Sequence, residues 1–159
     1  MNENKELVLV SNLRKNCRET LTKMSRSTGI PVSTLFDMLR KTDKIRKHTC
    51  IPYFSKLGYG VKAFMSIAVE TDHKSEVKAY LLSHPNLNSL FKINNGFDYM
   101  AEIICRSLHD LETISETINE KYNITKKEVH YVIEDIAREE FFSNSALWDS
   151  DFMHEQSGV

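Results

Sequence analysis

The stretch Val61-Lys-Ala-Phe-Met-Ser-Ile-Ala-Val69 (VKAFMSIAV) decides the fold of the second half of the chain. Its odd-numbered residues are apolar, and successive side chains of a strand point to opposite faces of a sheet. Residues 61–70 are therefore predicted to form a strand with one buried face. The same alternation returns further along the chain, at Phe97, Tyr99, Ala101, Ile103 and Cys105.

The segments around these two strands predict an ordered series of strands and helices. Helical spacing is found over residues 77–81 and again over 111–118. Apolar alternation predicts strands over 87–93 and 129–133, and Asn94-Asn95-Gly96 is typical of a hairpin turn. The resulting order βαββαβ is that of a ferredoxin-like domain.

Before residue 50 the apolar residues are spaced with the period of a helix. Helices are expected over residues 5–15 and 19–27, and a third from Pro31, which is tolerated in a first turn. Gly29 can adopt the left-handed conformation that ends the second helix. Two short helices joined by a glycine turn behind a leading helix predict a helix-turn-helix. The β-prone residues 45–51 that follow are expected to form either a basic wing or a linker strand.

The fold class is therefore predicted as α+β, an N-terminal winged helix-turn-helix followed by a ferredoxin-like βαββαβ domain. We expect a DNA-binding domain over 1–50, a linker over 51–60, an effector and oligomerisation domain over 61–138, and an acidic C-terminal extension over 139–159. The extension holds five acidic residues and the aromatic stretch from Phe141 to Trp148. It is either a partly ordered segment that packs on a neighbour or a terminus that frays after about Asp151.

Composition and charge narrow the class of protein. The 159 residues are 41% hydrophobic and 27% charged, which excludes a disordered or collagen-like chain. Residues 1–48 hold 11 Lys and Arg against 5 Asp and Glu, a net charge of +6, whereas residues 49–159 hold 10 against 17, a net of −7. A basic head suggests a polyanionic partner, although solvated charge placed by chance gives the same count. The three cysteines are widely spaced, and no apolar run is long enough for a membrane helix or a signal peptide, so we expect a cytoplasmic protein without disulfides and no membrane partner.

The third predicted helix supplies a candidate DNA-binding surface. If Leu35, Met38 and Leu39 face inward, the other side chains of the helix face outward. Four of these are candidates for base or phosphate contacts: Ser33, Thr34, Phe36 and Asp37. Six more are candidate phosphate anchors: Arg26, Arg40, Lys41, Lys44, Arg46 and Lys47. The alternative is a solvated helix face on which Ser33 only caps the helix.

The predicted hairpin supplies a candidate effector site at Asn94, Asn95, Gly96 and Asp98. The Asp98 carboxylate would bind the ammonium of an amino acid, and free N–H groups of the turn would bind its carboxylate. The alternative is that Asn-Asn-Gly is simply favourable turn chemistry and that Asp98 pins the turn.

Several stretches resemble the Lrp/AsnC family of prokaryotic transcription regulators, in the form found in archaea. The stretches are LVSNLRKNCR (9–18), LTKMS (21–25), GIPVSTL (29–35), LGY (57–59), VKAFMSIAV (61–69) and NGFDY (95–99). The resemblance covers about residues 5–136 and implies a regulator that binds double-stranded DNA, forms a homodimer and assembles further into a tetramer or octamer. It also implies an amino-acid effector bound between dimers at the hairpin. The turn at 42–45 is shorter than the family's and lacks its glycine, which predicts a different wing or hinge.

No motif indicates catalysis or a metal site. The six histidines are scattered, no phosphate-binding glycine loop is present, and no nucleophile motif occurs, so we expect neither an enzyme nor a metal centre nor a cofactor other than an amino-acid effector. The predicted function is sequence-specific regulation of transcription from a pseudo-palindromic site. The alternative is a small-molecule-binding ferredoxin-like protein, enzymatic or not, whose basic head is structural.

Overall fold

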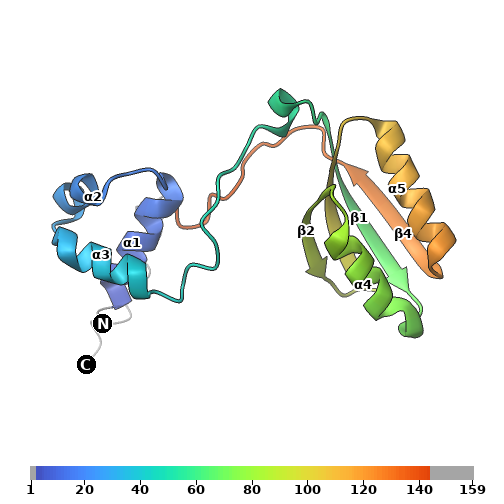
Figure 1. Cartoon of the computed structure of the whole chain (residues 1–159), viewed down its shortest axis with the longest axis horizontal. Helices are drawn as coiled ribbons and strands as arrows, with labels where there is room; N and C mark the ends of the chain where they lie inside the picture. Colours follow the sequence, from blue (N-terminus) through green and yellow to red (C-terminus); the bar gives the residue numbers. More distant parts are fainter. Residues whose placement is uncertain (1–2, 144–159) are drawn as a thin grey trace. The chain divides into compact units, whose positions relative to one another are not determined.

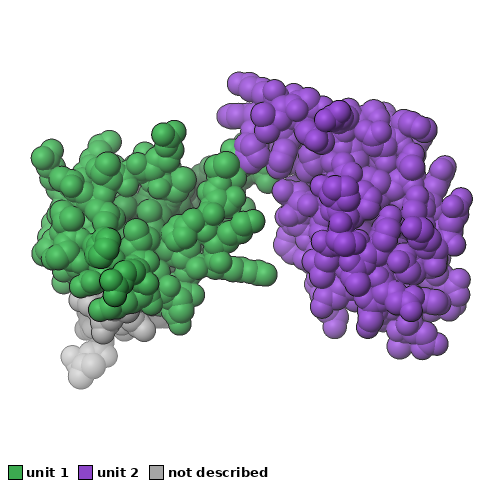
Figure 2. Space-filling view, in the orientation of Figure 1, with its two compact units in different colours: residues 1–51, 136–159 green, residues 52–135 purple. Residues whose placement is uncertain are grey.

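The computed structural model describes residues 3–143 and separates the chain into two compact units (Figures 1 and 2). The first, called here the helical unit, comprises Met1–Ile51 and Ile136–Val159. The second, the sheet unit, comprises Pro52–Asp135. No helix in the described part of the chain combines the length and apolar character needed to span a membrane.

The helical unit contains α1 (Glu3–Lys15), α2 (Leu21–Thr28) and α3 (Val32–Lys41). The Thr20 side chain caps α2 by accepting a hydrogen bond from the backbone N–H of Lys23. Gly29 ends α2 with a φ of 71°, which a residue without a side chain adopts without strain. The three helices bury a small apolar cluster of Leu9, Met24, Ile30, Leu35 and Met38.

The predicted wing is not seen as a strand. Residues 42–53, all of them described, contain no strand, so the three helices stand without the paired strands of a wing. A β-prone segment forms a strand only where a second segment satisfies its backbone groups. None of the described residues of the helical unit forms a strand with which residues 45–51 could pair.

The sheet unit confirms the α+β class and the predicted order of elements. Its strands are β1 (Val61–Val69), β2 (Leu87–Lys92), β3 (Tyr99–Cys105) and β4 (Ile124–Tyr131). They form one antiparallel sheet in the order β2-β3-β1-β4. Its helices are α4 (Lys74–Ser83) and α5 (Leu108–Lys121), preceded by the short 3-10 helices η1 (Phe54–Leu57) and η2 (Thr71–His73).

Both helices pack on the same face of the sheet. Met65 and Ile67 of β1 are fully buried together with Val77 of α4 and Leu111 and Ile118 of α5. Ser107 and Asp110 start α5 with a reciprocal capping box. The alternation read at residues 61–69 therefore predicts correctly which face of β1 is covered.

The start of β3 and both ends of β4 differ from the prediction. β3 begins at Tyr99 rather than Phe97, because Asp98 uses its backbone and side chain in the turn that precedes the strand. β4 spans Ile124–Tyr131 and so begins five residues before the predicted strand over 129–133. Ile133 lies beyond its end and is 100% exposed, although the N–H of Val132 still donates to the Lys62 carbonyl. The apolar alternation at 129–133 thus continues past the last residue of the strand. The predicted fraying after Asp151 lies outside the described residues.

Candidate functional site

The exposed face of α3 carries the candidate base-contacting residues. Leu35 and Met38 are buried and Leu39 is half-buried, as the helical period predicts. Ser33, Asp37 and Arg40 are exposed, Phe36 is 52% exposed and Thr34 is half-buried. Pro31 is the N-cap of α3 and no side chain caps the helix, so the Ser33 hydroxyl does not act as a cap.

The basic candidates divide into two kinds. Arg26 in the last turn of α2, together with Lys41, Arg46 and Lys47, is exposed. Lys44 is different, because its ammonium lies 2.7 Å from a carboxylate oxygen of Glu6 on α1. Glu6 is only 4% exposed, and a buried carboxylate requires a cationic partner. Within the helical unit, Lys44 therefore acts as the counter-charge of Glu6.

The candidate effector loop joins β2 to β3. Asn95 and Gly96 both have positive φ, 63° and 82°, which is the backbone of a tight hairpin turn. Asn94, Asn95 and Gly96 are exposed. The Ile93 N–H donates to the Asp98 carbonyl across the loop, and the Asp98 N–H donates to the Ile67 carbonyl of β1.

The Asp98 carboxylate is satisfied within the protein. One oxygen lies 2.6 Å from the ammonium of Lys74, and the other accepts the Val69 N–H at 2.9 Å. The hydrogen bond from Lys74 is the largest of the effects that lower the pKa of Asp98, and the bond from Val69 adds to it. The expectation that Asp98 pins the turn is therefore met by these contacts, while its predicted role toward a ligand is not tested by them.

We expect the stability of the sheet unit to depend on the ionisation of Asp98. Because its folded pKa is lowered, its contribution is complete above the unfolded pKa of about 3.9 and is lost as the pH falls through the folded pKa. Asp98→Asn should lower the free energy of unfolding by about 1 kcal/mol at neutral pH, and the deficit should shrink below about pH 4. Urea denaturation at several pH values checks this, with Asp72→Asn as the control because Asp72 is exposed. A deficit that is independent of pH would contradict the ionic origin.

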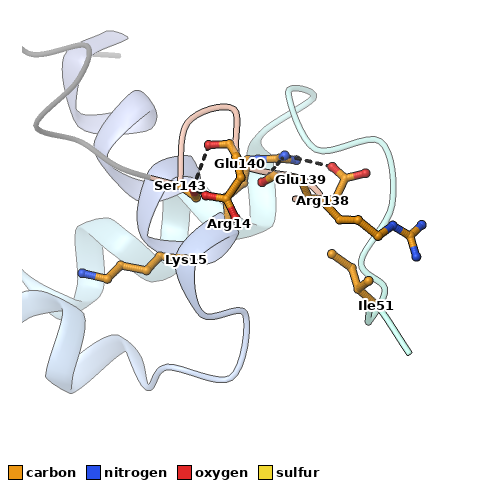
Figure 3. A pocket seen from close by; sticks show the side chains of 7 residues that line it. All are labelled: Arg14, Lys15, Ile51, Arg138, Glu139, Glu140 and Ser143. Atoms are coloured by element: carbon orange, nitrogen blue, oxygen red, sulfur yellow. Dashed lines mark hydrogen bonds and ion pairs between the residues drawn. The ribbon is translucent and has the colours of Figure 1, made fainter. Parts of the chain in front are cut away.

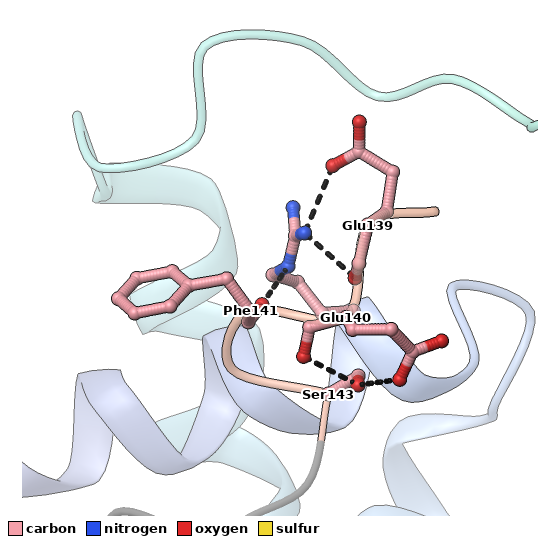
Figure 4. Close-up of polar contacts among 5 residues, drawn as sticks. Glu139, Glu140, Phe141 and Ser143 are labelled. Atoms are coloured by element: carbon pink, nitrogen blue, oxygen red, sulfur yellow. Dashed lines mark hydrogen bonds and ion pairs between the residues drawn. The ribbon is translucent and has the colours of Figure 1, made fainter. Parts of the chain in front are cut away.

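Arg14 holds a segment that the sequence pattern did not connect to it. Its guanidinium donates to the carbonyls of Phe141 at 2.6 Å and Glu139 at 2.8 Å, and to the Glu139 carboxylate at 2.8 Å (Figure 4). Next to these contacts lies an open pocket of about 600 Å³ in the helical unit (Figure 3). It is lined by Arg14, Lys15, Ile51, Arg138, Glu139, Glu140 and Ser143. Since Arg14 and Glu139 are 125 residues apart, no local period signals their contact.

The sequence analysis also did not single out Glu102, a buried carboxylate on β3. Glu102 is 6% exposed, and one of its oxygens accepts hydrogen bonds from the Asn88 amide at 2.6 Å and the Ser89 hydroxyl at 2.8 Å. The ammonium of Lys62 lies 4.0 Å from its other oxygen and also pairs with Asp135. The only available signal was a charged residue inside an apolar strand, Tyr99–Cys105.

Within residues 3–143 no group of three or more His, Cys, Asp or Glu side chains is arranged to hold a metal ion. The candidate residues therefore form two separate sets, the exposed α3 face of the helical unit and the β2–β3 loop of the sheet unit. The first offers hydroxyl and cationic donors, and the second offers turn amides beside an ion pair.

Comparison with known proteins gives one family and several relatives. Residues 62–140 match the model of the Lrp/AsnC ligand binding domain. The HTH-type transcriptional regulator FL11 of Pyrococcus furiosus is 25% identical over 113 residues, which are 69% of this chain and 75% of that protein.

Among solved structures, the transcriptional regulator NMB0573 of Neisseria meningitidis, in complex with L-Met, has a TM-score of 0.76 at 14% identity, covering 84% of this chain and 90% of that chain. AsnC of Escherichia coli has a TM-score of 0.74 at 17% identity, covering 87% and 96%. These two structures share the fold.

Proposed function

Because the chain belongs to the Lrp/AsnC family of transcriptional regulators and carries that family's ligand-binding domain at residues 62–140, we propose that its helical unit binds double-stranded DNA through α3. The observation that carries this proposal is the exposed face of α3, which follows the glycine turn at Gly29. In a helix-turn-helix the second helix lies in the major groove, and its N-terminal residues reach the base edges. Ser33, Thr34, Phe36 and Asp37 are the residues to which we assign base contacts.

Phosphate contacts are assigned to the basic residues around α3. Five of them are exposed, and within residues 3–143 none of the five forms an ion pair with an acidic side chain: Arg26, Arg40, Lys41, Arg46 and Lys47. Such contacts set affinity and register without reading sequence. Lys44 would reach a phosphate only by sharing its ammonium with Glu6.

A homodimer built from the sheet unit would give two such helices. The face of the sheet opposite α4 and α5 carries apolar side chains of three strands: Phe64, Phe91, Met100 and Ile104. Phe91 is 46% exposed on this face, whereas Ile104 is 6% exposed and lines a pocket with Phe54 and Leu57 of η1. Packing of two such faces would be isologous, and a two-fold protein predicts a pseudo-palindromic DNA site. Assembly beyond the dimer, to a tetramer or octamer, is part of the proposal.

The β2–β3 loop is proposed to bind an amino-acid effector. The Asp98 carboxylate already binds one ammonium, that of Lys74, and an amino acid's ammonium would need the same kind of partner. An incoming ammonium that displaces Lys74 would leave the lysine free to pair with the ligand's carboxylate. Exposed amides of Asn95 and Gly96 are further donors. The solved complex of the neighbouring regulator with L-Met supports an amino acid as the ligand class.

Asp98→Ala should abolish the response to an amino acid without lowering the affinity of the effector-free protein for DNA. The substitution removes the carboxylate that would bind the ammonium, and it lies outside the helical unit. Calorimetric titration with each amino acid, followed by DNA binding at saturating ligand, measures both effects, and Asp72→Asn is the control. An unchanged heat of binding would remove Asp98 from the effector site.

Fluorescence anisotropy with a random-sequence duplex at several salt concentrations, with the mass measured by light scattering, tests the DNA-binding proposal. The regulator predicts that log affinity falls steeply with log salt and that the bound species is a dimer or larger. A folded oligomer that binds no duplex at low salt would instead favour the alternative, a small-molecule-binding ferredoxin-like protein with a structural head.

A further inference from the structure

Arg14, at the C-terminal end of α1, binds an acidic segment of the same chain, residues 139–141. Arg14 directs its guanidinium to two main-chain carbonyls and one carboxylate of residues 139–141 (Figure 4). A surface ion pair alone contributes little, because two exposed side chains are easily separated by solvent. The two carbonyl contacts are different, since they require one backbone geometry to face the planar guanidinium. The contact therefore recognises the shape of the segment as well as its charge.

The docked segment also has an internal structure that fits this contact. The Ser143 N–H and hydroxyl both donate to the Glu140 carbonyl, at 3.0 and 2.7 Å, and the hydroxyl lies 3.0 Å from the Glu140 carboxylate. Glu139 and Phe142 have φ values of 57° and 64°, a conformation uncommon for residues with a side chain. The turn presents the Glu139 and Phe141 carbonyls in the same direction, toward Arg14.

The C-terminal segment lowers the net charge of the helical unit. Residues 1–51 hold 11 Lys and Arg against 5 Asp and Glu, a net of +6. Residues 136–159 hold one arginine against five acids, Glu139, Glu140, Asp149, Asp151 and Glu155, a net of −4. The helical unit, which comprises both ranges, therefore has a net charge of +2 instead of +6. Attraction of a basic surface for phosphates depends on this summed charge and is screened by salt.

We propose that the contacts of Arg14 with residues 139–141 tether the acidic C-terminal segment to the helical unit, where its charge competes electrostatically with DNA. This inference rests on the proposed DNA binding for its consequence, and on the Arg14 contacts alone for the docking. It assigns the acidic extension a function that is separate from effector binding at the β2–β3 loop. Release of the segment raises the affinity of the helical unit for any duplex.

The competition is tested by removing charge while keeping the chain length. In the full chain, Glu139, Glu140 and Glu155 are changed to Gln, and Asp149 and Asp151 to Asn. The control neutralises five exposed acids of the sheet unit, namely Asp72, Glu112, Glu116, Glu120 and Glu134. The C-terminal variant should bind a random duplex about tenfold more tightly than the parent at low salt, with the gap closing at high salt. The control, with the same net charge, should gain much less.

The docking is tested without DNA. Arg14→Lys preserves the charge, but its ammonium cannot donate to both carbonyls and the carboxylate in the geometry of a guanidinium. Hydrogen exchange measured by mass spectrometry should be faster in peptides covering residues 136–143 of this variant. Lys15→Arg is the matched control at the next residue, because Lys15 lines the same pocket.

The outcomes separate the inference from the proposed function. Unchanged exchange in Arg14→Lys overturns the docking. Equal DNA affinity of the parent and the C-terminal variant, when both bind, overturns the competition but leaves the proposed function standing. If the parent binds no duplex at any salt, the proposed function fails and the competition fails with it, while faster exchange in Arg14→Lys still supports the docking.

Discussion

Arg40→Ala combined with Lys47→Ala should weaken binding to every duplex, on the order of 100-fold at moderate salt, and flatten its salt dependence. Arg40 lies in the last turn of α3 and Lys47 in the extended segment after it, and both are exposed. If each contacts one phosphate, a dimer loses four contacts. The slope of log affinity against log salt should then become shallower by roughly 3 to 4. Anisotropy titrations over a range of salt concentrations measure both quantities.

The loss should be uniform across sequences, because phosphate contacts carry no base information. Lys78→Ala with Lys121→Ala is the control, since it removes the same charge from α4 and α5 of the sheet unit. An unchanged slope in the Arg40 and Lys47 variant would show that the phosphate-contacting surface lies elsewhere on the chain.

Leu35→Ala should unfold the helical unit while leaving the sheet unit folded. Leu35 is fully buried in a cluster of only five buried side chains, so its truncation leaves a cavity that few neighbours can fill. Such substitutions lower the free energy of unfolding by about 2–5 kcal/mol, a large share of the stability of a small domain. Hydrogen exchange should show that α1, α2 and α3 lose protection while β1 and β3 retain it, and DNA binding should be lost.

Leu39→Ala is the matched control on the same helix. Leu39 is half-buried, so we expect a loss of about 1 kcal/mol and a helical unit that stays folded. If Leu35→Ala reduced the protection of β1 as much as that of α3, the two units would not fold independently.

Local periodicity predicted most of the fold. The alternation over 61–69 identified β1 and its covered face, because the side-chain period of a strand is contained in adjacent residues. The glycine at 29 located the end of α2 for the same local reason. The wing and both ends of the closing strand were predicted incorrectly, since a strand needs a partner that its own sequence does not specify.

The sequence also predicted the family. The stretches that resemble Lrp/AsnC regulators run through both units, and the match of residues 62–140 to the ligand binding domain confirms that resemblance. The order βαββαβ, read from apolar spacing alone, agrees with the observed order of elements.

The partners of individual charges were decided only by the tertiary structure. The sequence made Lys44 a candidate for a DNA phosphate and Asp98 a candidate for a ligand's ammonium, but the fold pairs them with Glu6 and Lys74. Arg14 meets Glu139 across 125 residues of sequence. The physical reason is that periodicity constrains neighbours along the chain, whereas an ion pair requires only proximity, and 21 cations and 22 acids allow many pairings until the backbone brings particular ones together.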